Sequence, residues 1–153
     1  MKVSVVMINY NRAKEVKRLL KDLDNQDFKG FETIVIDNAS DYNAKKEVEV
    51  AFPKVKYFRL EKNIGKTAGF NYGAKKAKGE FLVFFDGDVR IALNTISKYI
   101  EILENNSKIG IVCPAVYLEN GKYFGPAYDI VFKAILTSPS KKTKNSPLAF
   151  LAP

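Results

Sequence analysis

The chain of 153 residues contains no histidine and only one cysteine. The absence of histidine excludes the commonest general base of enzymes and every nucleophile activated by an imidazole. The single cysteine, Cys113, excludes an internal disulfide and is typical of a protein from a reducing compartment. Any acid–base chemistry must therefore come from carboxylates, lysine or tyrosine.

Long apolar runs are also lacking. No stretch approaches the ~18 consecutive apolar residues of a membrane-spanning helix. Residues 1–8 are too short for the apolar part of a secretion signal and are better suited to a first strand. We therefore expect a cytoplasmic protein.

The charge is unbalanced, with 25 lysines and arginines against 17 acids and a net charge of +8. Most of the lysines are scattered along helical segments, which argues against a nucleic-acid surface and favours ordinary solvated positions. The only dense run is Lys141-Lys142-Thr143-Lys144. The basic segment 133–144 could rest on the inner face of a membrane, and a solvated, disordered tail is the alternative.

Apolar patterning predicts alternating strands and helices in one domain. Strand and helix alternate at least four times, which favours an α/β fold with a mostly parallel central sheet and helices on both faces. Asn11 is expected to cap the first helix, and Asn120-Gly121 to turn a C-terminal hairpin. The expected strands are 3–8, 32–36, 55–60, 81–85 and 110–113, and the expected helices contain 16–23, 44–51, 67–78 and 93–105.

The most informative motif is Asp86-Gly87-Asp88, which directly follows the apolar run 81–85. A continuous apolar run of this length is typical of a strand covered on both faces. Carboxylates at the carboxyl end of such a strand lie where open α/β sheets bind ligands. Hard divalent cations commonly bind through one or two carboxylates together with substrate phosphates. The motif thus predicts a metal that holds a phosphorylated ligand.

Two other polar clusters follow the first and second expected strands, namely Asn9-Tyr10-Asn11-Arg12 and Asp37-Asn38-Ala39-Ser40. In a parallel sheet all three loops rise at one edge and can surround one ligand. A dinucleotide-binding domain needs a glycine-rich turn after its first strand, and none is present. No P-loop motif occurs either. The charge of a diphosphate in this chain would therefore be met by a metal rather than by a glycine-rich turn, and Asp86 and Asp88 could hold that metal.

These motifs, in their order and spacing, resemble the family-two inverting glycosyltransferases of GT-A fold. The resemblance covers roughly residues 1–125, and its asparagine-containing variants are similar to the rhamnosyltransferase-type subgroup. It rests on Asn9-Tyr10-Asn11-Arg12, Asp37-Asn38-Ala39-Ser40, Asn63-Ile64-Gly65, Ala68-Gly69-Phe70-Asn71-Tyr72-Gly73, Gly79-Glu80-Phe81 and Asp86-Gly87-Asp88.

The resemblance implies a site that binds a UDP, dTDP or GDP sugar. A Mn²⁺ or Mg²⁺ ion on Asp86 and Asp88 would bridge the donor diphosphate and stabilise charge on the leaving nucleoside diphosphate. The acceptor would be a glycan or a lipid-linked molecule, with no role for nucleic acid. The residues implied for the nucleotide are Tyr10, Asn11, Asp37, Lys66 and Asp86. Gly65, Gly69 and Gly73 are expected to serve turns and close helix–sheet packing.

One part of the family pattern is missing. Inverting members use a carboxylate base well downstream of the metal motif, and no acidic pair follows Asp88 at that distance. The catalytic base is therefore unknown. We expect residues 1–126 to form the nucleotide-sugar-binding core and 127–153 an incomplete or flexible extension that lacks the acceptor half. The chain is then either a fragment or a naturally short relative. The later acids are Glu101, Glu104, Glu119 and Asp129.

Two other functions stay open at this point. A non-catalytic nucleotide-binding or assembly module would keep the fold and explain the missing base. A sugar-nucleotidyltransferase would also be metal-dependent, although its glycine-rich and basic signature is represented here only by Arg12. Release of a nucleoside diphosphate by a longer chain would favour a glycosyltransferase, and release of pyrophosphate a nucleotidyltransferase.

Overall fold

The computed structural model describes residues 1–118 and 120–123, which divide into two compact units between residues 96 and 97. The first unit holds the sheet. Its strands are β1 (Val3–Asn9), β2 (Phe31–Asp37), β3 (Lys56–Arg59) and β4 (Phe81–Asp86), and its helices are α1 (Ala13–Asp24), α2 (Lys45–Ala51) and α3 (Lys66–Lys76). Helix α4 (Thr95–Asn105) begins at the end of the first unit and continues into the second.

The four strands form one parallel sheet in the order β3-β2-β1-β4. The register pairs Asn9 with Asp37 and Ile8 with Asp86, so the carboxyl ends of β1, β2 and β4 lie at one edge. This register brings together the three polar clusters that the sequence places after strands. The predicted α/β fold with a mostly parallel sheet is confirmed.

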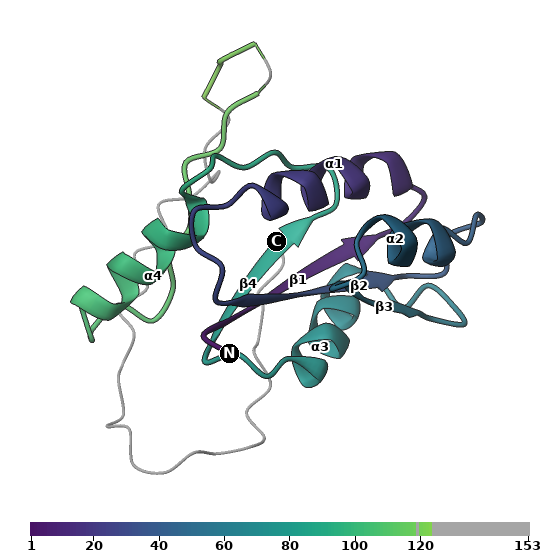
Figure 1. The fold of residues 1–153 in the computed structure, drawn as a ribbon, viewed down its shortest axis with the longest axis horizontal. Helices are drawn as coiled ribbons and strands as arrows, with labels where there is room; N and C mark the ends of the chain where they lie inside the picture. The colour runs from purple at the N-terminus through teal and green to yellow at the C-terminus, as the bar shows by residue number, and fades with distance from the viewer. Residues whose placement is uncertain (119, 124–153) are drawn as a thin grey trace. The chain divides into compact units, whose positions relative to one another are not determined.

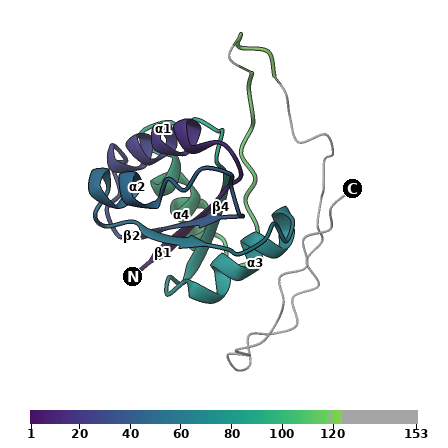
Figure 2. The ribbon, with the colours of Figure 1, turned by 90° about the vertical axis from the view of Figure 1, so that its right-hand side faces the viewer.

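Helices cover both faces of the sheet, as Figures 1 and 2 show, with α1 and α2 on one face and α3 on the other. The strand order explains this arrangement. The crossovers through α1 and α2 both run from β1 toward β3, whereas the crossover through α3 returns past β1 to β4. Because parallel crossovers are right-handed, reversing their direction places the helix on the opposite face.

Helix α3 packs closely on the sheet because two of its positions are glycine. A Cβ added at Gly69 would lie 2.5 Å from Ile8 Cδ1, and one at Gly73 would lie 2.3 Å from Val6 Cγ1. Phe70 fills the core between them, together with Val6, Ile34 and Ile36. The expectation that these two glycines serve close packing is confirmed.

Helix α1 buries a single apolar stripe. Val16, Leu19, Leu20 and Leu23 are at most 1% exposed, as their spacing predicts. Arg12, and not Asn11, occupies the N-cap position, and the Arg12 side chain makes no capping hydrogen bond. The cap prediction is wrong by one residue, because the Asn11 side chain instead pairs with Asp41 in the next loop.

The amino-terminal edge of the sheet is closed by one buried carboxylate. Glu32 accepts hydrogen bonds from Ser4 Oγ at 2.6 Å, from the Lys78 amide at 2.7 Å and from Lys56 Nζ at 2.6 Å. Burial raises the pKa of Glu32, but these three donors outweigh it and hold the pKa below its ordinary value. Ser4 Oγ also accepts from the Gly79 amide at 2.8 Å, so this cluster joins three strands to the turn before β4.

Two expectations for the second half of the described chain need correction. Residues 110–113 form no strand, because within residues 1–118 and 120–123 no segment pairs with them. Strand β4 is mostly half-buried, since it pairs with β1 alone in the described sheet. The hairpin is present as one antiparallel bridge between Tyr117 and Tyr123, with Gly121 at φ +76° in its turn.

The remaining expectations fall partly outside the described residues. The proposed boundary at residue 126 and the basic segment 133–144 both lie there. Within the part of the chain that the structure describes, no helix has the length and apolar character needed to cross a membrane.

Candidate functional site

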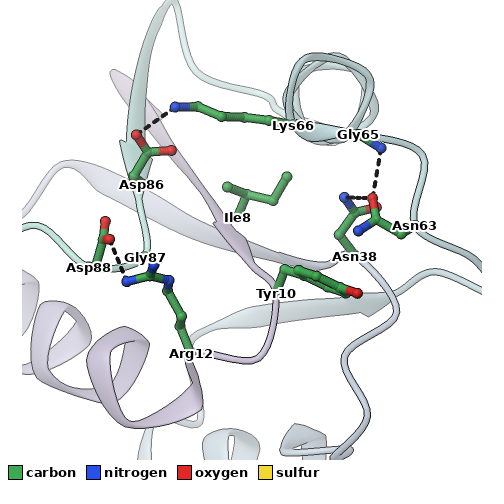
Figure 3. Close-up of a pocket in the computed structure, with 10 residues that line it drawn as sticks. All are labelled: Ile8, Tyr10, Arg12, Asn38, Asn63, Gly65, Lys66, Asp86, Gly87 and Asp88. Carbon is green, nitrogen blue, oxygen red and sulfur yellow. Dashed lines mark hydrogen bonds and ion pairs between the residues drawn. The ribbon is translucent and has the colours of Figure 1, made fainter.

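A pocket of about 430 Å³ opens at the carboxyl edge of the sheet, over the ends of β1 and β4. This is the point where the strand order reverses, because β2 and β3 follow β1 on one side and β4 lies on the other. Open α/β sheets bind ligands at such a switch point. Figure 3 shows the lining residues, which are Ile8, Tyr10, Arg12, Asn38, Asn63, Gly65, Lys66, Asp86, Gly87 and Asp88.

Two ion pairs line the pocket (Figure 3). Lys66 Nζ lies 2.7 Å from Asp86 Oδ2, and Arg12 Nη1 lies 2.7 Å from Asp88 Oδ2. Both carboxylate side chains are 41% exposed, so each is reachable from solvent. The lining thus holds two anionic and two cationic side chains, which come from three separate loops.

Lys66 is positioned by an amide network in front of α3. Asn63 Oδ1 accepts from the Gly65 amide at 2.9 Å and from Asn38 Nδ2 at 2.8 Å. Asn38 Oδ1 accepts in turn from the Ile64 amide at 3.0 Å. Gly65 has φ +83°, a conformation that favours glycine and lets the helix start at the pocket wall. Its expected role in a turn is confirmed.

The turn after β1 brings Tyr10 and Arg12 to the pocket. Asn9 Oδ1 accepts from the Arg12 amide at 3.1 Å and so fixes the turn from within. Asn11 adopts φ +57°, and its backbone amide donates to Ser40 Oγ at 2.9 Å. Tyr10 is left 48% exposed beside the cavity, which gives the pocket an aromatic surface.

Gly87 is required where β4 ends. A Cβ added there would lie 2.7 Å from the Ile8 carbonyl oxygen and 2.8 Å from Val16 Cγ2. A glycine between the two acids therefore lets the loop pass close to β1 and α1. This contact holds Asp86 and Asp88 next to the turn that carries Arg12.

Asp37 does not line the pocket. Its side chain is fully buried, with Oδ1 accepting from the Ser40 amide at 2.9 Å and Oδ2 from Arg59 Nη1 at 2.8 Å. Arg59 also donates to the Ser40 carbonyl at 2.6 Å. In this arrangement Asp37 holds the loop after β2 in place.

The structure therefore brings together four of the six residues that the sequence singles out. Tyr10, Lys66, Asp86 and Asp88 line the pocket, whereas Asn11, in the turn after β1, and Asp37, at the end of β2, do not. Sequence reasoning missed the lining roles of Arg12, Asn38 and Asn63. Their signal was present, since all three belong to motifs that carry the resemblance, but none was singled out as a site residue.

The donor set suits a hard divalent cation that a ligand helps to bind. Asp86 and Asp88 offer carboxylate oxygens in a pocket with room for a phosphate group. Within the described residues no cluster of three or more acidic, cysteine or histidine side chains is present that could hold an ion. The residues thus fit Mn²⁺ or Mg²⁺ shared with a phosphorylated ligand, because such ions commonly use one or two carboxylates plus phosphates.

The comparisons with known proteins agree on one family. The profile of glycosyl transferase family 2 matches residues 4–150. A cholesterol galactosyltransferase of Borreliella burgdorferi is 31% identical over 145 residues, which is 91% of this chain and 38% of that protein. A dolichol-phosphate mannosyltransferase of Pyrococcus furiosus is 32% identical over 127 residues, 80% of this chain and 35% of that protein. The chain thus spans little more than a third of these relatives.

Solved structures show the same fold. S. aureus TarS 1–349 in complex with UDP has a TM-score of 0.64 at 29% identity, covering 80% of this chain and 43% of that one. The mannosyltransferase PcManGT from Pyrobaculum calidifontis, solved with GDP-Man and Mn²⁺, has a TM-score of 0.67 at 22% identity, covering 75% and 36%. The second likeness concerns the fold alone.

Proposed function

Since the chain belongs to glycosyl transferase family 2, we propose that its pocket binds the nucleoside diphosphate part of a sugar donor. In a whole protein the bound sugar is then transferred to a glycan or lipid-linked acceptor. The observation that carries the proposal is the convergence of Arg12, Lys66, Asp86 and Asp88 on one pocket at the switch point of the sheet.

The diphosphate is proposed to lie between the start of α3 and the turn after β1. Lys66 and Arg12 supply positive charge from those two sides. No side chain caps the first turn of α3, and its N-terminal end favours an anion. Arginine suits phosphate because its guanidinium donates two parallel hydrogen bonds. Tyr10 offers a flat, half-exposed ring for the nucleoside.

Asp86 and Asp88 are proposed to hold Mn²⁺ or Mg²⁺ together with the donor. The ion supplies Lewis-acid stabilisation of the charge that develops on the leaving nucleoside diphosphate. Asp86 and Asp88 would hold the ion in place, and Arg12 and Lys66 would neutralise the diphosphate charge that the ion leaves unmet.

We keep Asn11 and Asp37 in the proposal as nucleotide-binding residues, although neither side chain lines the pocket. Asp37 accepts from the Ser40 amide on Oδ1 and from Arg59 on Oδ2, and a carboxylate oxygen can accept more than one hydrogen bond. Because the Asp37 side chain is fully buried, a base or ribose hydroxyl would reach it only if the groups that cover it moved aside. The Asn11 side chain donates to the Asp41 carboxylate and accepts from the Asp41 backbone amide, and these two hydrogen bonds hold the loops after β1 and β2 together.

The stereochemical course and the donor sugar are also proposals. We propose transfer with inversion, and a rhamnosyltransferase-like donor preference as the sequence variants indicate. No catalytic base is assigned to a residue of this chain. A whole protein supplied with a panel of donors that includes a rhamnosyl nucleotide tests both points, by the anomeric configuration of the product and by the sugar transferred.

The deciding experiment is a calorimetric titration of the chain with UDP, GDP and dTDP, each with and without Mn²⁺. We expect one nucleotide to bind, and binding to weaken at least tenfold without Mn²⁺ or in Asp88→Ala. Asp24→Ala is a matched control, because Asp24 is exposed on α1 and does not line the pocket. Failure of all three nucleotides to bind folded protein would overturn the proposal.

A further inference from the structure

The two ion pairs of the pocket occupy the same carboxylates that a divalent cation needs. We infer that Arg12 and Lys66 act as internal counter-ions, which hold Asp88 and Asp86 until the donor arrives. The cation and the nucleoside diphosphate then bind together, and the cation alone binds weakly. This inference rests on the proposed function of the pocket.

Arg12 competes with a cation for Asp88. Its Nη1 lies 2.7 Å from Asp88 Oδ2, and it comes from the loop before α1, whereas Asp88 follows β4. A cation that reaches Asp88 must displace the guanidinium or share the carboxylate with it. Sharing is unfavourable, because a dication and a guanidinium on one carboxylate repel each other.

Lys66 repeats the arrangement on the other wall of the pocket. Figure 3 shows its side chain extended from the start of α3 toward Asp86 at the end of β4, and its Nζ lies 2.7 Å from Asp86 Oδ2. The ammonium is a mobile point charge on four methylenes, so it can follow an incoming phosphate. Each pocket acid therefore has its own cation, supplied by a different loop.

Both pairs are weak enough to be exchanged. The side chains of Arg12 and Lys66 are 57% and 63% exposed, so water and salt compete for them. Exposed ion pairs of this kind shift an equilibrium by about two- to fivefold. The pairs thus tune cation binding and do not block it.

A diphosphate supplies the exchange partner. Its oxygens attract Arg12 and Lys66, and charge-assisted bonds from arginine to phosphate are among the strong ones. As the two cations turn to the phosphate, Asp86 and Asp88 are freed for the metal. Because coupling between two ligands is reciprocal, the cation strengthens nucleotide binding by the same factor.

The first test measures Mn²⁺ binding alone, without nucleotide, at low ionic strength. We expect Arg12→Gln to bind Mn²⁺ about three- to tenfold more tightly than the parent chain, from the loss of repulsion and of the competing pair. Lys66→Gln should show a gain in the same direction. The control is Arg18→Gln, which removes one positive charge from the exposed face of α1 away from the pocket and should change little.

A second arm locates the ion. In Arg12→Gln combined with Asp88→Asn, the gain in Mn²⁺ affinity should disappear. Unchanged or weaker Mn²⁺ binding by both Arg12→Gln and Lys66→Gln, or an equal gain in Arg18→Gln, would overturn the inference. Nucleotide titration of the parent chain reports on the proposed function separately, because the Mn²⁺ arm contains no nucleotide.

Discussion

The two edges of the sheet carry similar residues that serve different purposes. At the amino-terminal edge Glu32 is 6% exposed and bonded to Ser4, Lys56 and the Lys78 amide. At the carboxyl edge the side chains of Asp86 and Asp88 are each 41% exposed, and each forms an ion pair with one basic side chain. Both edges pair carboxylates with basic side chains, but Glu32 is buried, whereas the two pocket acids are half-exposed.

The difference lies in how fully each carboxylate is satisfied. Glu32 accepts two hydrogen bonds on Oε1 and one on Oε2, and its side chain is only 5% exposed. Asp86 and Asp88 keep half-exposed oxygens in an open pocket. A pair of a carboxylate and a basic side chain therefore indicates a binding site only when the carboxylate is still accessible to a ligand. The following predictions test this contrast.

The largest effect is expected for Glu32→Ala. This change leaves Lys56, Ser4 and the Lys78 amide without their shared acceptor, and breaking one partner of a buried polar network costs about 3 kcal/mol. Urea unfolding followed by circular dichroism measures the loss. Asp88→Ala is the matched variant at the other edge and should keep its stability within about 0.5 kcal/mol. Equal losses in the two variants would contradict the contrast.

Glycine substitutions should separate the edges next. A Cβ at Gly79 would lie 2.4 Å from the Ser4 amide nitrogen and 2.5 Å from the Val3 carbonyl carbon, so Gly79→Ala forces backbone apart and should cost about 2 kcal/mol. Gly65 has open space around its Cβ position but φ +83° and ψ 160°, so Gly65→Ala should cost at least about 1 kcal/mol of backbone strain without any clash. Thermal unfolding ranks the two, and the reverse order would show that the amino-terminal edge yields more easily than its packing indicates.

The third prediction concerns pH. Hydrogen bonds from Lys56, Ser4 and the Lys78 amide outweigh burial and hold the folded-state pKa of Glu32 below the unfolded value of about 4.3. The ionised carboxylate therefore stabilises the fold above about pH 4.3, and this contribution is lost as the pH falls through the folded pKa. Unfolding of the parent chain and of Glu32→Gln between pH 3 and 7 measures it. The stability difference should be constant near neutral pH and shrink in acid.

Much of the fold follows from local pattern in the sequence. The apolar stripe of α1, the four strands and the start of α3 near Gly65 could all be predicted, because each depends on periodicity or on a glycine. The sequence of residues 110–113 alone could not decide whether they form a strand, since a strand exists only where another segment pairs with it. The half-buried state of β4 depends on its neighbours for the same reason.

The site was predictable in position but not in partners. The parallel register brings Asp86, Tyr10 and Lys66 to one edge, as the order of the motifs indicates. The sequence could not show that Asp37 is buried against Arg59, because that contact depends on how β2 and β3 pair. Nor could it show that Arg12 reaches Asp88, which lies 76 positions away in the chain.

The smallest effect on stability is expected from the pocket pairs themselves. A double-mutant cycle of Arg12→Gln and Asp88→Asn should give a coupling energy below about 1 kcal/mol, because both side chains are exposed and the attraction is screened. The matched cycle of Lys56→Gln and Glu32→Gln should exceed about 1 kcal/mol, since one partner is buried. Raising the salt concentration should abolish the first coupling and leave most of the second. A large, salt-resistant coupling at the pocket would mean that Arg12 and Asp88 form part of the folded scaffold, and the carboxyl edge would then resemble the closed edge beneath it.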